Sequence, residues 1–283
     1  MGALGYADDV ALLAPSLQAA KSMLRICDNF ANQFNVLFNA SKSVLLVQGD
    51  KRQIYRNVKL YLNNQLIEQK SNAVHLGTTI GEKCDQINLK KAAADLYVAT
   101  NCLMSRFSFC SIDVLTMLFN SYCTAFYGSV LWNLEDIENV EIAWKKCVKR
   151  IWRLDVRTRS QYVIHLMKCP LQEMLYVRFL RFFSNCWDSN NATICSIAKQ
   201  CLLGFSNIKK NVSRCADLIN MPPSYVADNR LIVFDALHDK FCPDDELVVH
   251  VDIIKELCYI REGTLVWDIG EDLIPHCLEF FLS

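Results

Sequence analysis

The chain has 283 residues, of which 52% are hydrophobic and 21% are charged, enough for a large core divided over two or three subdomains. Its formal net charge is zero, which by itself argues against a nucleic-acid partner. The first residues lack a secretory leader, so we expect an intracellular protein, cytoplasmic or nuclear. The 14 cysteines are scattered singly, so we expect reduced thiols and neither a disulfide framework nor a zinc knuckle.

Two adjacent carboxylates, Asp8 and Asp9, lie between two short apolar segments, Gly2–Tyr6 and Val10–Ala14. This pattern predicts a β-hairpin with the carboxylates at its tip. Hard cations such as Mg²⁺ prefer these oxygens, and paired metals assist phosphoryl transfer. Strand alternation sends the two side chains to opposite faces, which favours Asp8 as the metal ligand. A solvated surface turn is the alternative, because Asp is common in turns.

The next segment, Ser16 to Phe34, has apolar residues spaced three and four apart, which predicts an amphipathic helix with Ser16 as its N-cap. The face expected to be buried carries Ala20, Met23, Leu24, Cys27, Phe30, Ala31 and Phe34.

Short strands are predicted beyond this helix. A polar turn, Asn39 to Lys42, precedes an apolar strand, and Asn63-Asn64 is typical of a tight turn between two short strands within 59–67. Val74 to Ile80 is expected to be one strand, with Gly77 allowing the close approach of another backbone.

From Ile87 to about Ser206 the pattern is mostly helical, with helices expected over Leu89–Phe107, Ile112–Trp132, Ile137–Trp152 and Leu171–Trp187. The segment Val114–Trp132 has no charge and is long enough to cross a bilayer. Its polar residues, including Asn120 and Thr124, favour a helix buried in a bundle instead.

A dense basic block follows Trp144, made of Lys145, Lys146, Lys149, Arg150, Arg153, Arg157 and Arg159. An apolar stripe at helical spacing runs through it, formed by Trp144, Cys147, Val148, Ile151 and Trp152. The cations are therefore expected on the opposite face, where they can contact a phosphate backbone or simply be solvated.

The charge is unevenly distributed along the chain. Residues 235–283 hold 12 acidic and 3 basic side chains, so residues 1–234 carry a net charge of +9. The segment 206–224 is expected to be a linker, and residues 225–283 an acidic helical region in which Asp244-Asp245 begins a helix.

The order of these motifs resembles the reverse transcriptases of LINE-type (non-LTR) retrotransposons. The resemblance rests on the Tyr6-Ala7-Asp8-Asp9 hairpin, the helix after it, Asn39-x-x-Lys42 before an apolar strand, and His75-Leu76-Gly77. It extends to Phe126–Trp132 and to the basic block, which look like the thumb and post-thumb region of that family.

The resemblance implies an α+β fold in which a partial polymerase palm is followed by a mainly helical thumb and C-terminal region. Residues 1–82 would be the palm with a primer-grip-like strand, 83–205 the thumb and post-thumb region, 206–224 a linker and 225–283 the acidic helical region. The implied activity is DNA synthesis on an RNA template from a DNA primer and deoxynucleotides, with Mg²⁺ as cofactor and no membrane.

Roles are implied for individual residues as well. Asp8 would hold metal with Asp9 beside it, and Lys42 would give a proton to the leaving pyrophosphate. His75, Leu76 and Gly77 would grip the primer, and the basic block would contact nucleic acid. Lys42 as a solvated turn residue and His75 as a packed or surface residue are the alternatives.

Family members carry fingers and a strand with the first catalytic Asp ahead of the hairpin, which this chain lacks. We therefore expect a fragment that is inactive alone. A non-catalytic RNA/DNA-binding thumb module and an inert pseudogene product are the alternatives.

Overall fold

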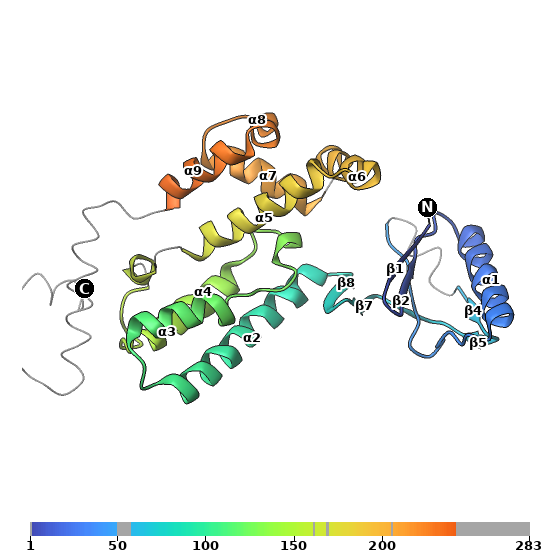
Figure 1. Cartoon of the computed structure of the whole chain (residues 1–283), viewed down its shortest axis with the longest axis horizontal. Helices are drawn as coiled ribbons and strands as arrows, with labels where there is room; N and C mark the ends of the chain where they lie inside the picture. Colours follow the sequence, from blue (N-terminus) through green and yellow to red (C-terminus); the bar gives the residue numbers. More distant parts are fainter. Residues whose placement is uncertain (1, 50–57, 161, 168–169, 205, 242–283) are drawn as a thin grey trace, which may run out of the picture. The chain divides into compact units, whose positions relative to one another are not determined.

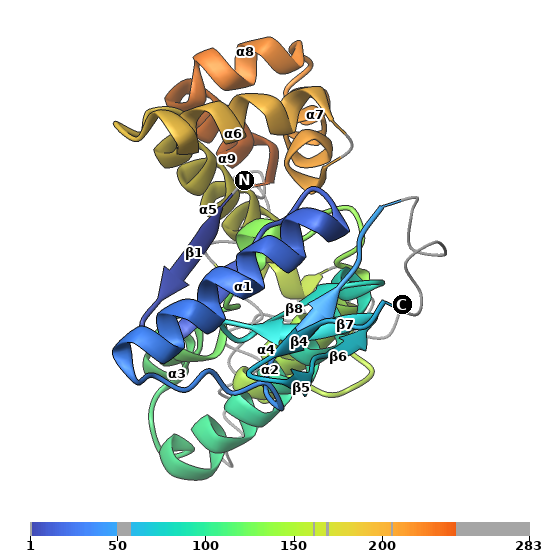
Figure 2. The ribbon, with the colours of Figure 1, turned by 90° about the vertical axis from the view of Figure 1, so that its right-hand side faces the viewer.

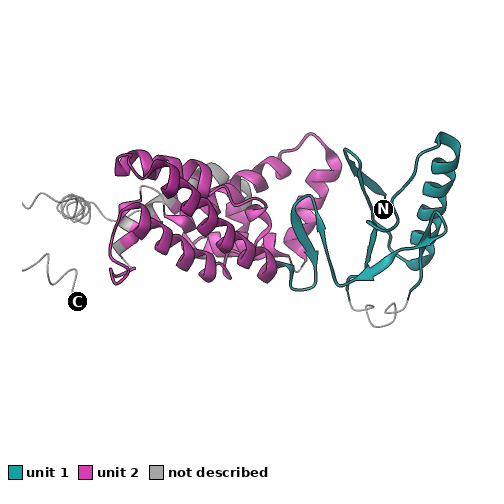
Figure 3. Cartoon of the chain, turned by 90° about the horizontal axis from the view of Figure 1, so that it is seen from below, with its two compact units in different colours: residues 1–84 teal, residues 85–283 magenta. Residues whose placement is uncertain are grey.

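The computed structural model describes residues 2–49, 58–160, 162–167, 170–204 and 206–241. The chain divides into two compact units, residues 1–84 and residues 85–283 (Figure 3). The described residues of unit 1 form small sheets and one helix, and those of unit 2 are helical, so the expected α+β class is confirmed.

Unit 1 begins with an antiparallel hairpin of β1 (Ala3–Tyr6) and β2 (Asp9–Leu12). Helix α1 (Leu17–Phe34) follows, drawn in blue in Figure 2. The Ser16 hydroxyl accepts a hydrogen bond from the Ala19 N–H at 3.2 Å, and Asn35 ends the helix in a left-handed conformation. Ser16 is therefore the N-cap, as predicted.

The rest of unit 1 consists of short strands. Strand β3 (Val44–Leu46) pairs in parallel with β6 (Glu68–Lys70), whereas β4 (Tyr61–Leu62) with β5 (Gln65–Leu66), and β7 (Asn72–His75) with β8 (Thr78–Gly81), form antiparallel hairpins. The four sheets of the described chain have two strands each. Leu24 of α1 packs in a small core with Ala40, Leu60, Leu62 and Ile67.

Helix α1 is less buried than its pattern predicts. Leu24 and Ala31 are buried, but the Phe34 side chain is 57% exposed, and Phe30 and Ile26 are also exposed. The rings of Phe30 and Phe34 contact one another, with centroids 4.5 Å apart. Residues 26, 30 and 34 thus form an apolar stripe that no described residue of unit 1 covers.

Unit 2 contains nearly all the helices (Figure 1). They are α2 (Cys84–Phe107), α3 (Ile112–Leu118), the π-helical turn η1 (Phe119–Cys123), the 3₁₀ turn η2 (Ser129–Leu131), α4 (Glu138–Ile151), the 3₁₀ segment η3 (Tyr162–Leu166), α5 (Leu171–Trp187), α6 (Ala192–Leu203), α7 (Asn207–Leu218), α8 (Pro223–Asp228) and α9 (Arg230–Phe241).

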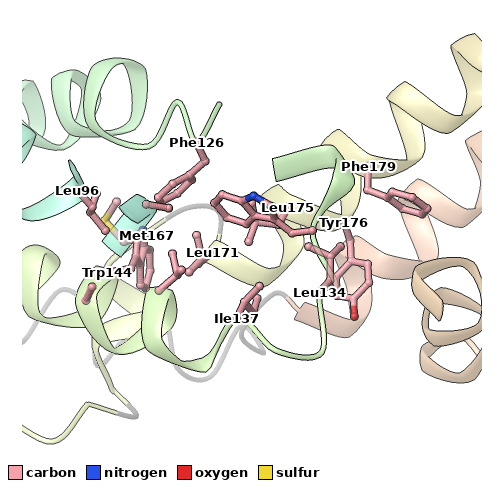
Figure 4. Packing of buried hydrophobic residues seen from close by; sticks show 14 of the residues in the cluster. Leu96, Phe126, Leu134, Ile137, Trp144, Met167, Leu171, Leu175, Tyr176 and Phe179 are labelled. Carbon is pink, nitrogen blue, oxygen red and sulfur yellow. The ribbon is translucent and has the colours of Figure 1, made fainter. Parts of the chain in front are cut away.

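One contiguous core runs through these helices. Figure 4 shows part of it, including Leu96 of α2, Trp144 of α4 and Phe179 of α5, all of which are almost completely buried. The stripe predicted on α4 is confirmed, because Trp144, Cys147, Val148, Ile151 and Trp152 are all buried. Each large aromatic ring buries a large apolar area and so contributes strongly to such a core.

A buried amide joins two distant segments of unit 2. Asn211 of α7 accepts a hydrogen bond from the Leu134 N–H at 3.0 Å and donates to the Trp132 carbonyl at 2.9 Å. Trp132 and Leu134 are buried, so this side chain satisfies backbone groups that burial would otherwise leave without a partner.

Two sequence predictions in unit 2 are wrong. The helix expected over 112–132 breaks after Cys123, because the chain widens into a π turn and Phe126 and Gly128 then adopt positive φ angles. The linker expected over 206–224 is largely helix, since α7 buries Val212, Cys215 and Ala216, and α8 starts at Pro223. Polar residues on the outer face of α7 concealed this pattern.

No helix in the described ranges is both long enough and apolar enough to span a bilayer. The predicted helix start at Asp244-Asp245 lies outside the described residues.

Candidate functional site

The two carboxylates lie at the tip of the first hairpin. Tyr6 pairs with Asp9, so the turn consists of Ala7 and Asp8 alone. Ala7 has a φ of 52°, which is unfavourable for a residue with a Cβ atom by about 1 kcal/mol. Asp8 thus occupies the turn and Asp9 starts β2, as the sequence predicts.

Paired residues share a face of this hairpin, which separates its side chains into two sets. Leu4, Tyr6 and Asp9 lie on one face, whereas Leu12, on the other, packs against the core beside α1. The Tyr6 side chain is 67% exposed and Leu4 is exposed as well. The face that carries Asp9 is therefore apolar and uncovered by the described residues.

Asp8 and Asp9 offer the carboxylate oxygens that Mg²⁺ prefers. Among the residues that the structure describes, however, no group of three or more His, Cys, Asp or Glu side chains gathers where it could hold a metal ion. The carboxylate of Asp28, also in unit 1, accepts the Asn63 N–H at 2.9 Å and so orients the β4–β5 turn. Asp8 and Asp9 are therefore a pair of exposed carboxylates to which the described residues add no third potential ligand.

The turn before β3 is organised by Asn39. Its side-chain oxygen accepts hydrogen bonds from the Ser41 hydroxyl at 2.7 Å and from the Lys42 N–H at 3.1 Å, and its carbonyl accepts the Ser43 N–H. This confirms the predicted polar turn and assigns Asn39 a local structural role. Lys42 is exposed, so its ammonium group is available to a ligand.

His75, Leu76 and Gly77 lie at the tip of the β7–β8 hairpin rather than inside a single strand. His75 pairs with Thr78, and both turn residues have positive φ, 47° for Leu76 and 77° for Gly77. Such a turn favours Asn or Gly at its first position, as the β4–β5 turn has with Asn63. The glycine turns the chain back on itself, which is why the expected continuous strand is absent.

The candidate residues of the first hairpin, the Asn39 turn and the β7–β8 tip all belong to unit 1, but they do not form one hydrogen-bonded cluster. No hydrogen bond or ion pair in the described part of the chain joins the side chains of Asp8, Lys42 and His75 to one another. Strand β3, which follows Lys42, contacts β7, which ends at His75. The turn that carries Lys42 thus leads into a strand that contacts the β7–β8 hairpin.

The basic block does not form the uniform cationic face that the sequence predicts. Lys145 is paired with Glu141 at 2.7 Å, one helical turn away. The Lys149 side chain is only 8% exposed, and its Nζ donates to the Val156 carbonyl at 3.1 Å. The chain folds back after α4, which brings Val156 over Lys149 and removes this lysine from the surface.

The environment of Lys149 also changes its acidity. Burial is the main cause that lowers the pKa of the Lys149 ammonium group, the neighbouring Lys146 lowers it further, and Asp155 opposes both. A buried, hydrogen-bonded lysine contributes to the fold and not to phosphate binding. The residues of the block that remain exposed are Lys146, Arg150, Arg157 and Arg159.

Two arginines of the block connect helices instead of facing solvent freely. The guanidinium group of Arg150 donates through Nη1 to the side-chain oxygen of Asn101 in α2. Arg153 donates through Nη2 to the Ser108 carbonyl, just beyond α2, at 2.5 Å. They fix the end of α4 to the end of α2.

Sequence reasoning missed the turn at residues 76–77. The positive φ of Leu76 could have been inferred from Leu-Gly between two alternating segments, a pattern that indicates a two-residue turn.

Comparison of the chain with protein-family models, with curated proteins and with solved structures yields no match.

Proposed function

We propose that the chain is part of an RNA-directed DNA polymerase of the LINE-type retrotransposon kind, in which residues 1–84 contribute the end of the palm and unit 2 the thumb. The observation that carries this proposal is the Tyr6-Ala7-Asp8-Asp9 hairpin, which presents two carboxylates on a tight turn and packs Leu12 beside α1. The two-residue turn leaves both carboxylates exposed at the tip, where they can reach a metal ion.

In such a polymerase, Asp8 would hold Mg²⁺ with Asp9 beside it, and the metal would supply charge stabilisation for nucleotidyl transfer. Lys42, exposed at the Asn39 turn, provides a proton for the pyrophosphate, and the His75-Leu76-Gly77 tip supports the primer end. The described residues bring no third carboxylate to the hairpin, so this chain needs one from another segment to polymerise.

Primer extension tests the proposal. The chain, and a chimaera in which the fingers and first palm strands of a LINE-type reverse transcriptase precede it, are each given an RNA template, an annealed DNA primer, deoxynucleotides and Mg²⁺. We expect extension only from the longer polypeptide. Asp8→Asn should lower its rate about a thousandfold, since ligand loss removes several kcal/mol of charge stabilisation.

The matched control is Asp113→Asn, which removes an exposed carboxylate from unit 2 and should leave the rate unchanged. Extension that survives Asp8→Asn would contradict the assignment of the hairpin. Extension by the chain alone would contradict the need for a further segment.

A second candidate function is a non-catalytic RNA/DNA-binding module. It is favoured by the continuous buried core of unit 2 and by the exposed cations on α4 and just after it. It predicts salt-dependent binding of a labelled RNA–DNA hybrid in the presence of a chelator, unaffected by Asp8→Asn. If the longer polypeptide binds the hybrid but never extends it, this second function replaces the first.

A further inference from the structure

The apolar stripe of α1, formed by Ile26, Phe30 and Phe34, is a surface of unit 1 that the small core of this unit leaves uncovered. We call it the α1 stripe. The three side chains are large and apolar, yet they are 65%, 46% and 57% exposed. The Phe30 and Phe34 rings contact one another, with centroids 4.5 Å apart, so part of the stripe is already ordered. A contiguous apolar patch on a protein surface commonly marks an interaction site.

The α1 stripe carries no charge of its own helix. At 100° per residue, the charged side chains of α1 lie about 140–180° around the axis from Phe30. They are Lys21, Arg25 and Asp28. The polar residues that border the stripe, Asn29 and Gln33, are exposed and uncharged, and β4, which contacts α1, is uncharged as well. A partner can therefore cover the stripe without removing a charge of α1 from water.

The exposed area of the α1 stripe is what a small dimer interface needs. A fully exposed side chain of this size offers roughly 200 Å², so the three side chains together expose about 340 Å². Apolar atoms supply about 60% of a protein interface, which corresponds to about 560 Å² per copy and about 1,100 Å² for two copies. This value exceeds the lower limit of about 1,000 Å² for a specific interface.

The spacing of the α1 stripe fits pairing with an identical helix. Ile26 and Phe34 lie four residues on either side of Phe30, and rows of residues four apart form the ridges that interlock in the commonest helix packing. If two antiparallel copies meet at Phe30, a two-fold axis passes between their Phe30 rings and each Ile26 faces the partner's Phe34. Both copies then use the same surface, so the contact closes as a dimer and does not continue into a filament.

We propose that the chain forms a two-fold dimer in which the α1 stripes of two copies pack against one another in antiparallel orientation. The partner is a second copy of this chain. An interface at the small end of the range gives a modest affinity, so we expect a dissociation constant in the micromolar range. The dimer does not use the carboxylates of the first hairpin, and Asp8→Asn should dimerise as the unsubstituted chain does. The dimer and the polymerase assignment therefore succeed or fail separately.

Sedimentation equilibrium of the full chain, at concentrations from about 1 to 100 μM, tests the proposal. The mean mass should rise from that of one chain towards that of two. Phe34→Glu and Phe30→Glu should each weaken dimerisation at least about 30-fold, because each replaces a central apolar contact with an unpaired charge. The matched control is Phe109→Glu, which places the same charge on an exposed ring of unit 2 and should leave the dissociation constant unchanged.

A pair of opposite charges tests the antiparallel arrangement. Ile26→Lys and Phe34→Glu should each be monomeric alone at concentrations where the unsubstituted chain is a dimer. An equimolar mixture of the two should form a heterodimer, because the introduced ammonium group then faces the introduced carboxylate. The second contact between residue 26 and residue 34 stays apolar in this heterodimer. Its dissociation constant should rise with salt, which screens the new ion pair.

Several results would overturn the proposal. They are a monomer at every concentration, a dimer that Phe34→Glu and Phe30→Glu leave unchanged, and a mixture of the charged variants that yields no heterodimer. A loss of stability to urea in Phe34→Glu that is independent of protein concentration would show instead that another part of the same chain covers the stripe. Because the substituted side chains are exposed, the circular dichroism spectra should not change, which separates each of these results from misfolding.

Discussion

The two units differ in how completely they cover their apolar residues. In unit 2, Trp144, Phe179 and Phe183 are almost completely buried in one core. In unit 1, Tyr6, Phe30 and Phe34 remain exposed, and the core consists of five small or medium aliphatic side chains. Unit 2 therefore has the packing of an independently stable domain, whereas unit 1 exposes surfaces suited to further contacts.

The largest expected difference between the units concerns their aromatic residues. Phe179→Ala should lower the free energy of unfolding by about 3–5 kcal/mol, because it leaves a cavity in a dense core. Phe34→Ala in unit 1 should change it by less than about 1 kcal/mol. Urea unfolding followed by circular dichroism measures both, and equal effects would show that the cores do not differ as described.

Removal of the buried amide should have the next largest effect. Asn211→Ala leaves the Leu134 N–H and the Trp132 carbonyl without their partner, at a cost of about 2–4 kcal/mol. The control is Asn190→Ala, an exposed asparagine in the same unit, which should be nearly neutral. A small effect of Asn211→Ala would indicate that water replaces the amide and that the η2–α4 segment is less dependent on α7.

Buried thiols should make unit 2 sensitive to alkaline pH. Burial raises the pKa of Cys123 to about 11, with Thr100 opposing the shift, and burial raises the pKa of Cys215 to about 12. Because these values exceed the ordinary thiol pKa of 9.0, the native state retains protons that the unfolded state releases above pH 9. Stability that is fully present below pH 9 should therefore decrease as the pH rises towards 11.

Cys215→Ala should reduce this pH dependence by up to about 2 kcal/mol between pH 9 and 11, measured by urea unfolding at each pH. Cys102→Ala, which removes an exposed thiol, serves as the control. If the loss of stability is the same in all three proteins, the alkaline transition does not arise from the buried thiol.

The smallest expected effect compares two turns of unit 1. Leu76→Asn should stabilise the chain by about 0.5–1 kcal/mol, because Asn adopts positive φ more easily than Leu. Asn63→Leu should destabilise it by more, since it also removes the hydrogen bond from the Asn63 side chain to the Phe38 carbonyl at 2.8 Å. A destabilising Leu76→Asn would show that the leucine side chain makes a contact that outweighs its backbone strain.

Sequence patterns predicted the elements whose signal is local. The first hairpin, the Ser16 cap, the Asn63-Asn64 turn and the buried stripe of α4 all follow from residue preferences and spacing. The predicted bounds of α5 match the structure, because Pro170 precedes its first turn.

Features that depend on distant residues were not predictable. Lys149 is buried only because the chain returns over it after α4, and Phe30 and Phe34 are exposed because no described element covers that side of α1. Strand β3 pairs in parallel with β6, which lies more than twenty residues further along the chain. Nothing in the composition of either strand identifies its partner. Whether a cation is available to a ligand is likewise a property of the tertiary fold.

The π turn at Phe119–Cys123 has a consequence for chain length. A π turn holds one residue more than an α-helical turn, so it resembles a single-codon insertion absorbed within a helix. Deletion of the exposed Ser121 should therefore convert it into an ordinary α-helical turn with little disturbance to α3. The same deletion within α5 would rotate every following side chain by about 100° and turn Phe183 away from the core.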